Sequence, residues 1–265
     1  MSFFYLILLA VIQGVTEFLP VSSSAHLVLF PALTGQEDQG LVIDVAVHVG
    51  SLCAVLLYFR HDVYDLCIGF LKLCAGKKTQ AGRESIYLII ATIPVLIAGY
   101  LLHRAMPEGI RDLEVIAATT IIFGLLLWAA DVWGRKTRSY HDISVLDALI
   151  VGCLQVFALI PGTSRSGITM TAARMLGFNP KDAARFSLLL SIPTIMGAGF
   201  LGGVDLYQSG SYVLGQAALW SLLLSFIAAY IAISVMMRWL SKSGFLPFVI
   251  YRLLLGLGLV IYLYL

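Results

Sequence analysis

Long apolar windows run along most of the chain and are separated by short polar segments. Crossing a bilayer takes about 20 consecutive apolar residues in a helix. Six windows meet this requirement without a break: residues 41–59, 86–102, 113–133, 186–204, 213–238 and 246–265. The pattern therefore predicts six transmembrane helices.

Two further apolar stretches are each interrupted near the middle by proline and small hydroxyl residues. The first, about residues 3–34, contains LPVSSSAH (19–26), and the second, about 145–175, contains IPGTSRSG (160–167). Irregular backbone at membrane depth is stable only where it is buried in protein or lines a wet cavity. We therefore expect two re-entrant helix–loop–helix segments that enter the membrane and turn back.

The two interrupted stretches align with each other at an offset of 141 residues. The matched pairs are Pro20 with Pro161, Ser22 with Thr163, and Ser23 with Ser164. Each stretch is followed by three spans, and three is odd, so the second half is expected to be inverted relative to the first. This predicts one membrane domain, 1–265, built from inverted-topology repeats 1–141 and 142–265. In such architectures the binding site lies where the broken helices meet.

Composition and charge support a membrane protein and suggest its orientation. The chain is 60% hydrophobic and 12% charged, whereas soluble domains carry about 25% charged residues. We therefore expect an all-α integral membrane protein with no soluble domain. If loop 60–85 is cytoplasmic, only Arg104 and Arg111 lie on the opposite side of the membrane. Two further arginines, Arg165 and Arg252, lie within apolar segments, and all the other lysines and arginines are cytoplasmic. This asymmetry obeys the positive-inside rule and places both termini outside.

The first interrupted stretch carries ionisable groups, which are costly inside a bilayer and are therefore functional candidates. Gln13 and Glu17 are four residues apart and share one helix face. The run Ser22-Ser23-Ser24 follows Pro20 and is typical of the N-cap of a second helix. His26 follows Ser23 by three residues, so both are expected on one face of that helix.

The second interrupted stretch supplies hydroxyls and a cation at another expected helix start. Thr163, Ser164, Arg165 and Ser166 follow Pro161-Gly162. Two converging helix N-termini form an anion site, and arginine donates bidentately to phosphate oxygens. Glu17 contributes an oxygen ligand of the kind that a hard divalent cation prefers. This combination of groups is typical of phosphoryl transfer.

Structural interpretations of the same residues remain open. Ser22 and Ser24 could only satisfy carbonyls freed by the proline, and His26 could be a hydrogen-bonded structural group. Glu17 and Arg165 could form a buried ion pair that only holds the two halves together.

Other polar residues lie nearer the ends of the spans. Asp44 and His48, one turn apart, favour solvated interface positions. Arg252, in LPFVIYRLLLG, either belongs to the site or extends its charged end to the cytoplasmic surface.

The two motifs QGVTEFLPVSSSAH (13–26) and PGTSRSGIT (161–169) resemble those of the bacterial undecaprenyl-diphosphate phosphatases of the bacitracin-resistance type. The resemblance extends along the chain through DVAVHVGS to FLPFVIYR near the C-terminus. The family shows Glu or Gln at the first position of its acidic motif. This chain has Gln at position 13, and Gln is a weaker metal ligand than Glu. Ser24 and Ala25 stand where Thr and Gly are common.

The resemblance implies a metal-dependent enzyme that hydrolyses undecaprenyl diphosphate to undecaprenyl phosphate and inorganic phosphate. That reaction recycles the lipid carrier for cell-wall synthesis and gives bacitracin resistance. The expected catalytic residues are Glu17, His26, Ser23, Arg165 and Ser164, with Ser23 or His26 as nucleophile. The expected substrate-binding residues are Gln13, Ser22, Ser24, Thr163, Ser166 and Arg252. Glu17 and Gln13 are the expected ligands of a divalent cation, Mg²⁺ or Ca²⁺.

Location and partners follow from the same resemblance and from the charge pattern. We expect a multi-pass protein of the bacterial inner membrane whose active site opens to the periplasmic or exterior side. Its expected partners are a polyprenyl diphosphate lipid, membrane lipids and a second copy of the chain in a homodimer, with no nucleic acid because the net charge is only +2. The alternative function is a lipid-phosphate flippase or secondary transporter, since inverted repeats with broken helices also build transporters.

Overall fold

The structure is a computed structural model that describes residues 3–264 except 36–39, 107–109, 111 and 209–214. The described chain is helical. Its α-helices are α1 (Phe3–Phe18), α2 (Ser23–Thr34), α3 (Leu41–Tyr58), α4 (Arg60–Cys74), α5 (Gln80–Ala105), α6 (Leu113–Trp133), α7 (Val145–Gln155), α8 (Arg165–Met175), α9 (Pro180–Gln208), α10 (Gln216–Leu240) and α11 (Leu246–Tyr264). Short 3-10 turns η1 (Tyr140–Asp142) and η2 (Val156–Leu159) flank α7.

Helices α5, α6, α9, α10 and α11 are each long and apolar enough to cross a membrane. Helix α3 reaches that length only as a bent pair with α4, so the described chain has five or six such elements. Each of the six predicted spans coincides with one of these helices, although residues 213–214 and 265 lie outside the described residues. Large apolar side chains such as Trp133, Phe200 and Leu254 are exposed on them. The protein is therefore a multi-pass membrane protein.

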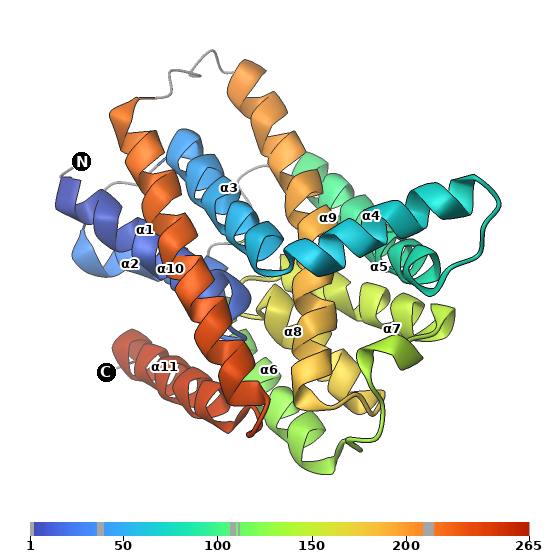
Figure 1. Cartoon of the computed structure of the whole chain (residues 1–265). Coiled ribbons are helices and arrows are strands. Elements are labelled where there is room, and N and C mark those ends of the chain that lie inside the picture. Colours follow the sequence, from blue (N-terminus) through green and yellow to red (C-terminus); the bar gives the residue numbers. More distant parts are fainter. Residues whose placement is uncertain (1–2, 36–39, 107–109, 111, 209–214, 265) are drawn as a thin grey trace.

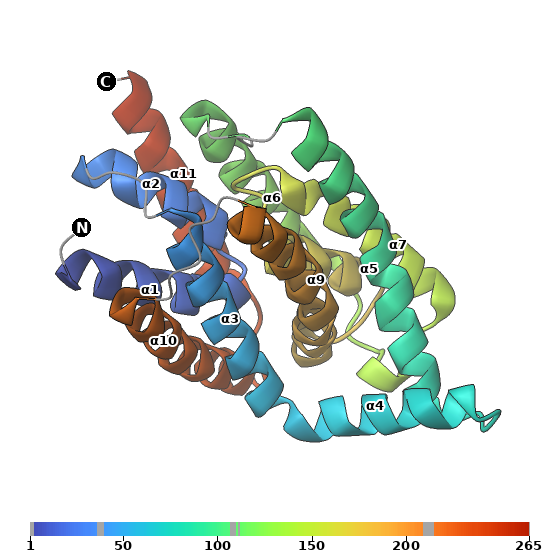
Figure 2. The same cartoon turned by 90° about the horizontal axis from the view of Figure 1, so that it is seen from above.

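Helix α4 corrects the expectation that residues 60–85 form a loop. Residues Arg60–Cys74 are helical, and the helix bends by 83° from α3. It runs across from the end of α3 toward α5 (Figure 2). Its sequence mixes Asp62, Asp65 and Lys72 with exposed Tyr64 and Leu71, a composition that suits a helix lying in a membrane interface. A search for long apolar windows does not detect such a helix.

Both predicted helix–loop–helix segments have a break at the expected place. Helices α1 and α2 are separated by residues 19–22 and pack against each other. Helices α7 and α8 are separated by η2 and residues 160–164, and they also pack against each other. Helices α1 and α7 are too short to cross a membrane alone.

The helices that follow the two breaks begin with the same cap. Ser22 precedes α2 with φ 72° and Ser164 precedes α8 with φ 71°. Each side chain accepts a hydrogen bond from the backbone N–H three residues later and lies 3.2 or 3.1 Å from the serine hydroxyl two residues later. A left-handed φ is strained for a non-glycine residue, so the match is specific.

The caps correspond at an offset of 142 residues (from 22 to 164), and the offset of 141 used to align the breaks is wrong at this point. The second break contains one more residue between its proline and its cap. That residue is Gly162, whose φ of +87° provides the additional turn. Ser23 therefore corresponds to Arg165 in the structure, and Ser22 corresponds to Ser164.

The helices pack so that the two breaks face each other near the centre of the molecule (Figures 1 and 2). Helix α10 packs against α1 and α3, and α3 also packs against α9. Helix α8 is surrounded by α6, α7 and α9, and α11 packs along α6. The largest apolar core cluster includes Phe18, Phe178 and Phe245.

Ion pairs connect the polar segments that the charge pattern assigns to one side of the membrane. The guanidinium of Arg185 pairs with Asp62 of α4. His141 Nδ1 lies 2.8 Å from Oε1 of Glu84. These contacts join the segments around residues 60–85, 134–144 and 174–185, which were expected on the same side.

Candidate active site

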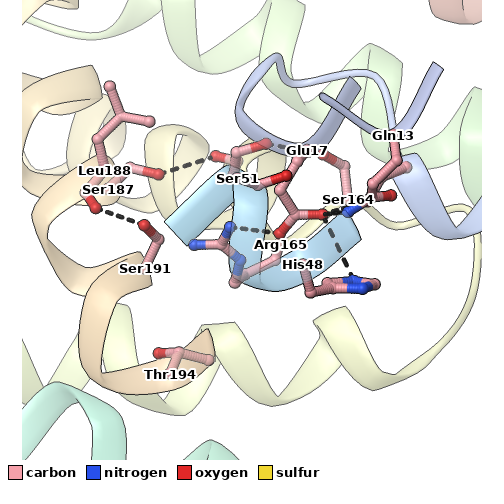
Figure 3. A network of polar contacts seen from close by, with 12 residues as sticks. Gln13, Glu17, His48, Ser51, Ser164, Arg165, Ser187, Leu188, Ser191 and Thr194 are labelled. Atoms are coloured by element: carbon pink, nitrogen blue, oxygen red, sulfur yellow. Dashed lines mark hydrogen bonds and ion pairs between the residues drawn. The ribbon is translucent and has the colours of Figure 1, made fainter. Parts of the chain in front are cut away.

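Glu17, in the last turn of α1, is the centre of a polar cluster and is only 8% exposed. Its Oε1 accepts a hydrogen bond from Nη2 of Arg165 at 2.8 Å. Its Oε2 accepts from Oγ of Ser23 at 2.7 Å and from Nε2 of Gln13 at 2.8 Å. Figure 3 shows the carboxylate between Gln13 and Arg165. The two breaks therefore meet at one carboxylate, as expected.

The convergence follows from where the two helices begin. Ser23 is the first residue of α2 and Arg165 is the first residue of α8. Free N–H groups and the helix dipole make a helix N-terminus a favourable place for an anion. Glu17 is the anion held beside these two helix starts, by the side chains of their first residues, Ser23 and Arg165. The same surroundings can bind a phosphate group that competes for Arg165.

Arg252 of α11 contacts both breaks and is 0% exposed. Its guanidinium donates to the carbonyl oxygens of Gly162 at 2.8 Å and Thr163 at 2.9 Å in the second break. It also reaches Pro20 in the first break at 3.4 Å and Thr120 of α6 at 3.1 Å. Arg252 therefore joins the two breaks by donating to their backbone carbonyl oxygens, an arrangement called the Arg252 clasp below. Its side chain does not extend to the surface, and it does not face the cluster around Glu17.

Most of the other hydroxyl side chains make hydrogen bonds that stabilise the backbone of the two breaks. Oγ of Ser166 donates to the carbonyl oxygen of Leu19 at 2.8 Å, which links α8 to the first break. Ser22 and Ser164 are buried and occupied as caps. Thr163 is buried, and its hydroxyl has no hydrogen-bond partner within the described residues.

His26 lies on α2 but faces α11. Its Nδ1 is 2.7 Å from the carbonyl oxygen of Ser22, which can only accept, so Nδ1 carries the proton. In the neutral ring, Nε2 is then an acceptor, and it lies 2.5 Å from the hydroxyl of Tyr251. The two rings are also stacked, with centroids 5.7 Å apart. The expected contact of His26 with the centre of the site is replaced here by a contact with Tyr251, a residue that the sequence did not single out.

A pocket of about 600 Å³ opens beside the cluster. Its polar wall consists of Glu17 and Arg165 together with Asp44 and His48 of α3. The remaining wall is formed by α3 and α9. Apart from Thr194 and two glycines of α9, its residues are apolar: Val45, Val49, Leu52, Ile195, Met196, Ala198 and Phe200. Asp44 and His48 were expected at a solvated interface, and the structure adds that both line this pocket. The sequence signal that could have placed Asp44 and His48 together is their spacing of one helical turn, which puts both on the same helix face.

The family model described as "Bacitracin resistance protein BacA" matches residues 6–258. This chain belongs to that family. Among the relatives of this BacA-family chain, "Undecaprenyl-diphosphatase" of Roseobacter denitrificans is 50% identical over 266 residues and the match covers 100% of both chains. "Undecaprenyl-diphosphatase" of Ruegeria pomeroyi is 51% identical over 261 residues, covering 98% of each chain. "Undecaprenyl-diphosphatase" of Saccharophagus degradans is 50% identical over 259 residues, covering 98% of this chain and 97% of the relative.

The side chains of this BacA-family site can contribute only part of a metal site. No group of three or more His, Cys, Asp or Glu side chains within the described residues is arranged to hold a metal ion. Gln13 donates its amide N–H to Glu17, and its Oε1 is buried without a hydrogen-bond partner in the described part of the chain. That oxygen and the Glu17 carboxylate are hard donors that suit a divalent cation whose other ligands come from phosphate oxygens and water.

Proposed function

We propose that this chain is a membrane phosphatase that hydrolyses undecaprenyl diphosphate to undecaprenyl phosphate and inorganic phosphate. The product is the lipid carrier for cell-wall synthesis, and its recycling would give bacitracin resistance. The names of relatives that match the whole chain at about half identity support this proposal. The observation that carries it is the Glu17 carboxylate, held by Ser23 and Arg165 at the polar end of an otherwise apolar pocket.

The shape and chemistry of the pocket suit an amphiphilic substrate. A prenyl diphosphate has a charged head and a long hydrocarbon tail. Arg165, the first residue of α8, provides the charged donor for the head at the polar end of the pocket, and Ser23 lies beside it through its contact with Glu17. The apolar residues of α3 and α9 would contact the first part of the tail. Because these helices lie among membrane spans, the rest of the tail can remain in the bilayer.

Substrate binding changes the partners of Glu17. The terminal phosphate competes with the carboxylate for the guanidinium of Arg165, since both anions accept the same donors. When Arg165 turns to the phosphate, Oε1 of Glu17 loses its hydrogen bond to the guanidinium, while Oε2 keeps its hydrogen bond from Ser23. Neutralisation of the phosphoryl oxygens by fixed donors is the main source of catalysis in such reactions.

Ser23 is the nucleophile that this geometry favours, because its hydroxyl already donates to Glu17. Oγ of Ser23 forms a bond to the terminal phosphorus while the bond from that phosphorus to the bridging oxygen breaks. Undecaprenyl phosphate leaves with the bridging oxygen, and the serine proton passes to Glu17. Water then attacks the phosphoserine, and the bond from phosphorus to Oγ of Ser23 breaks. The proton held by Glu17 returns to Oγ of Ser23, and inorganic phosphate leaves with the oxygen and both hydrogens of the water. Trapping and mass-mapping of a phosphorylated residue tests this step. A phosphate found on His26, or the absence of any phosphorylated residue under conditions that trap the intermediate, would contradict it.

A divalent cation, Mg²⁺ or Ca²⁺, is part of the proposal. Glu17 and the free Oε1 of Gln13 would hold it together with oxygens of the substrate. When bound, it would neutralise charge on the diphosphate. Gln13 also orients Glu17 through its amide N–H.

The membrane arrangement is proposed as two inverted repeats with re-entrant segments α1–α2 and α7–α8. The matched caps at Ser22 and Ser164 support a structural repeat. The ion pairs His141–Glu84 and Arg185–Asp62 support placing their segments on one side of the membrane, and the positive-inside rule assigns that side to the cytoplasm. With that orientation, the active site of this inner-membrane protein opens to the periplasmic or exterior side.

Phosphate release by purified protein in detergent distinguishes the phosphatase from a transporter, because no second compartment is present. Wild-type protein with a divalent cation should release phosphate from undecaprenyl diphosphate. Glu17→Gln and Arg165→Ala should each lower kcat by about 100-fold or more, as removal of a transition-state partner does. Glu84→Gln is the matched control, because Glu84 is also buried and paired but lies outside the site. Full activity in both site variants would contradict the proposed function.

A further inference from the structure

Helix α4 and the start of α5 form an arm that projects from the helix bundle, and the connection between them is its tip (Figures 1 and 2). Residues 72–83, which make up this tip, contain no aspartate or glutamate and four cations: Lys72, Lys77, Lys78 and Arg83. All four side chains are exposed. We propose that this basic tip binds the headgroups of anionic phospholipids and so anchors the arm in the lipid interface. The proposal does not depend on the reaction at the active site.

The backbone of the tip has a defined conformation. At the end of α4, the N–H of Lys77 donates to the carbonyl oxygen of Lys72 at 2.8 Å, across Gly76, which has a φ of 77°. At the start of α5, the hydroxyl of Thr79 accepts a hydrogen bond from the N–H of Gly82 at 3.1 Å. Both ends of the connection are therefore capped, and the basic side chains are held together at one end of the arm.

The positive charge of the tip is not neutralised by the protein. None of the four basic side chains pairs with a carboxylate within the part of the chain that the structure describes. The neighbouring Glu84 is buried and paired with His141. The acids of α4, Asp62 and Asp65, lie ten and seven residues before Lys72. These separations are about 15 and 10 Å along a helix, whereas charges in physiological salt are screened beyond about 8 Å.

An apolar pocket of about 380 Å³ lies beside the tip, between α4, α5 and α9. Leu71, the residue before Lys72, is one of the residues that line it. On the α5 side the hydroxyl of Ser85 donates its hydrogen to the carbonyl oxygen of Gly82 at 2.8 Å, and the other lining residues, such as Leu88, are apolar. A phospholipid needs both a positive surface for its phosphate and an apolar surface for its acyl chain. The arm offers the two together, which a free anion would not require.

The place of the arm in the fold strengthens this binding. Helix α4 continues from α3 and leads into α5, which is long and apolar enough to span a membrane, so the tip is held close to the bilayer surface. A helix with an apolar face and basic residues on its polar side is typical of the membrane interface. Each lysine or arginine near an anionic surface raises the affinity by about fivefold. Four such residues are therefore enough to concentrate anionic lipid around the tip.

Quenching of a fluorophore at the tip measures which lipids surround it. The fluorophore is attached to Cys74, the last residue of α4, which is exposed; the other three cysteines are replaced by alanine. The full chain is reconstituted into vesicles in which about one lipid in five is phosphatidylglycerol and the rest is phosphatidylcholine. Bromine atoms, which quench the fluorophore, are placed on the acyl chains of one lipid or of the other. The two quenching efficiencies, corrected for composition, give the local ratio of the two lipids relative to the bulk ratio.

Two variants with the same change of charge separate the tip from the rest of the surface. The arm variant carries four substitutions: Lys72→Gln, Lys77→Gln, Lys78→Gln and Arg83→Gln. The control variant carries four substitutions at basic residues that are also exposed but lie outside the arm: Arg135→Gln, Lys136→Gln, Lys181→Gln and Lys242→Gln. Both variants should keep the melting temperature of the wild type, because the replaced side chains are on the surface.

In the wild type, the local ratio of phosphatidylglycerol to phosphatidylcholine should exceed the bulk ratio by at least about fivefold, the effect of one basic residue. At 1 M salt, where screening shortens to about 3 Å, it should return to within about twofold of the bulk ratio. The arm variant should show the bulk ratio within about twofold at both salt concentrations. The control variant should behave as the wild type does.

Equal enrichment in the wild type and the arm variant would overturn the proposal. An equal loss in the control variant would show a general effect of net charge and would also overturn it. Absence of quenching by either brominated lipid would place the tip outside the membrane interface, against the proposal. Loss of enrichment on addition of inorganic phosphate, but not of chloride at the same ionic strength, would assign the tip to a free anion instead. None of these outcomes bears on the phosphatase activity, so the two proposals fail separately.

Discussion

Replacement of Arg252 by lysine tests whether the two breaks are held together by one buried guanidinium. Lysine keeps the positive charge but has one nitrogen in place of the planar fork. Three of the carbonyl contacts are short: Gly162 at 2.8 Å, Thr163 at 2.9 Å and Thr120 at 3.1 Å. A lysine ammonium at this position could reach about one of these carbonyl oxygens, so two buried acceptors would lose a charged donor.

The expected cost follows from those two contacts. A hydrogen bond to a charged group contributes about 1.5–3 kcal/mol, so Arg252→Lys should lower the free energy of unfolding by about 3–6 kcal/mol. At about 2 °C per kcal/mol for a chain of this size, that corresponds to a fall in melting temperature of roughly 6–12 °C. Activity should fall by about 100-fold as well, because small displacements of the breaks separate Ser23 and Arg165 from the reacting phosphate.

Thermal unfolding in detergent and phosphate release measure the two effects on the same preparation. Arg83→Lys is the control, since Arg83 is exposed on α5 and its replacement should change neither quantity. Loss of activity in Arg252→Lys without a change in melting temperature would refute the clasp and indicate direct contact with substrate. A melting temperature and a rate of phosphate release equal to those of the wild type would show that the carbonyl contacts contribute to neither stability nor activity.

Three further substitutions test other contacts of the site. Tyr251→Phe removes the donor to Nε2 of His26 and should lower the free energy of unfolding by about 1 kcal/mol with kcat unchanged; a large loss of kcat would contradict the placement of this pair outside the reaction. Gly162→Ala should lower the melting temperature much more than Gly76→Ala does. Both glycines have positive φ, but only the methyl group added at 162 meets other atoms, among them the carbonyl oxygen of Ile116 at 2.7 Å. Equal effects of the two substitutions would contradict this. Ser166→Ala loses the hydrogen bond to the first break and should cost about 1 kcal/mol of stability in an unfolding experiment, whereas an unchanged stability would show that this link is dispensable.

The spans and the helix starts were predictable because their determinants are local. An apolar window of about 20 residues has few alternatives to a membrane helix, and α5, α6 and α11 lie where such windows occur. Serines after a proline cap a helix through their own side chains, so the start of α2 could be inferred from four consecutive residues. The contact between Glu17 and Arg165 followed from the expectation that the two breaks meet.

The contacts that could not be predicted involve groups without a sequence signal. The partners of Arg252 are backbone carbonyls, which every residue carries, so no residue type identifies them. His26 and Tyr251 are 225 residues apart, and only the packing of α2 near α11 brings them together. The register between the two breaks depended on Gly162, because a single inserted residue with positive φ shifts the correspondence from 141 to 142.

The clasp at Arg252 has a consequence for biosynthesis. Membrane helices are inserted as the chain emerges from the ribosome, and α11 follows all the other described helices in the sequence. The breaks before α2 and α8 exist long before α11 is made, but the guanidinium that links them arrives only with residue 252. A nascent or truncated chain that stops before residue 252 would therefore be inserted yet inert.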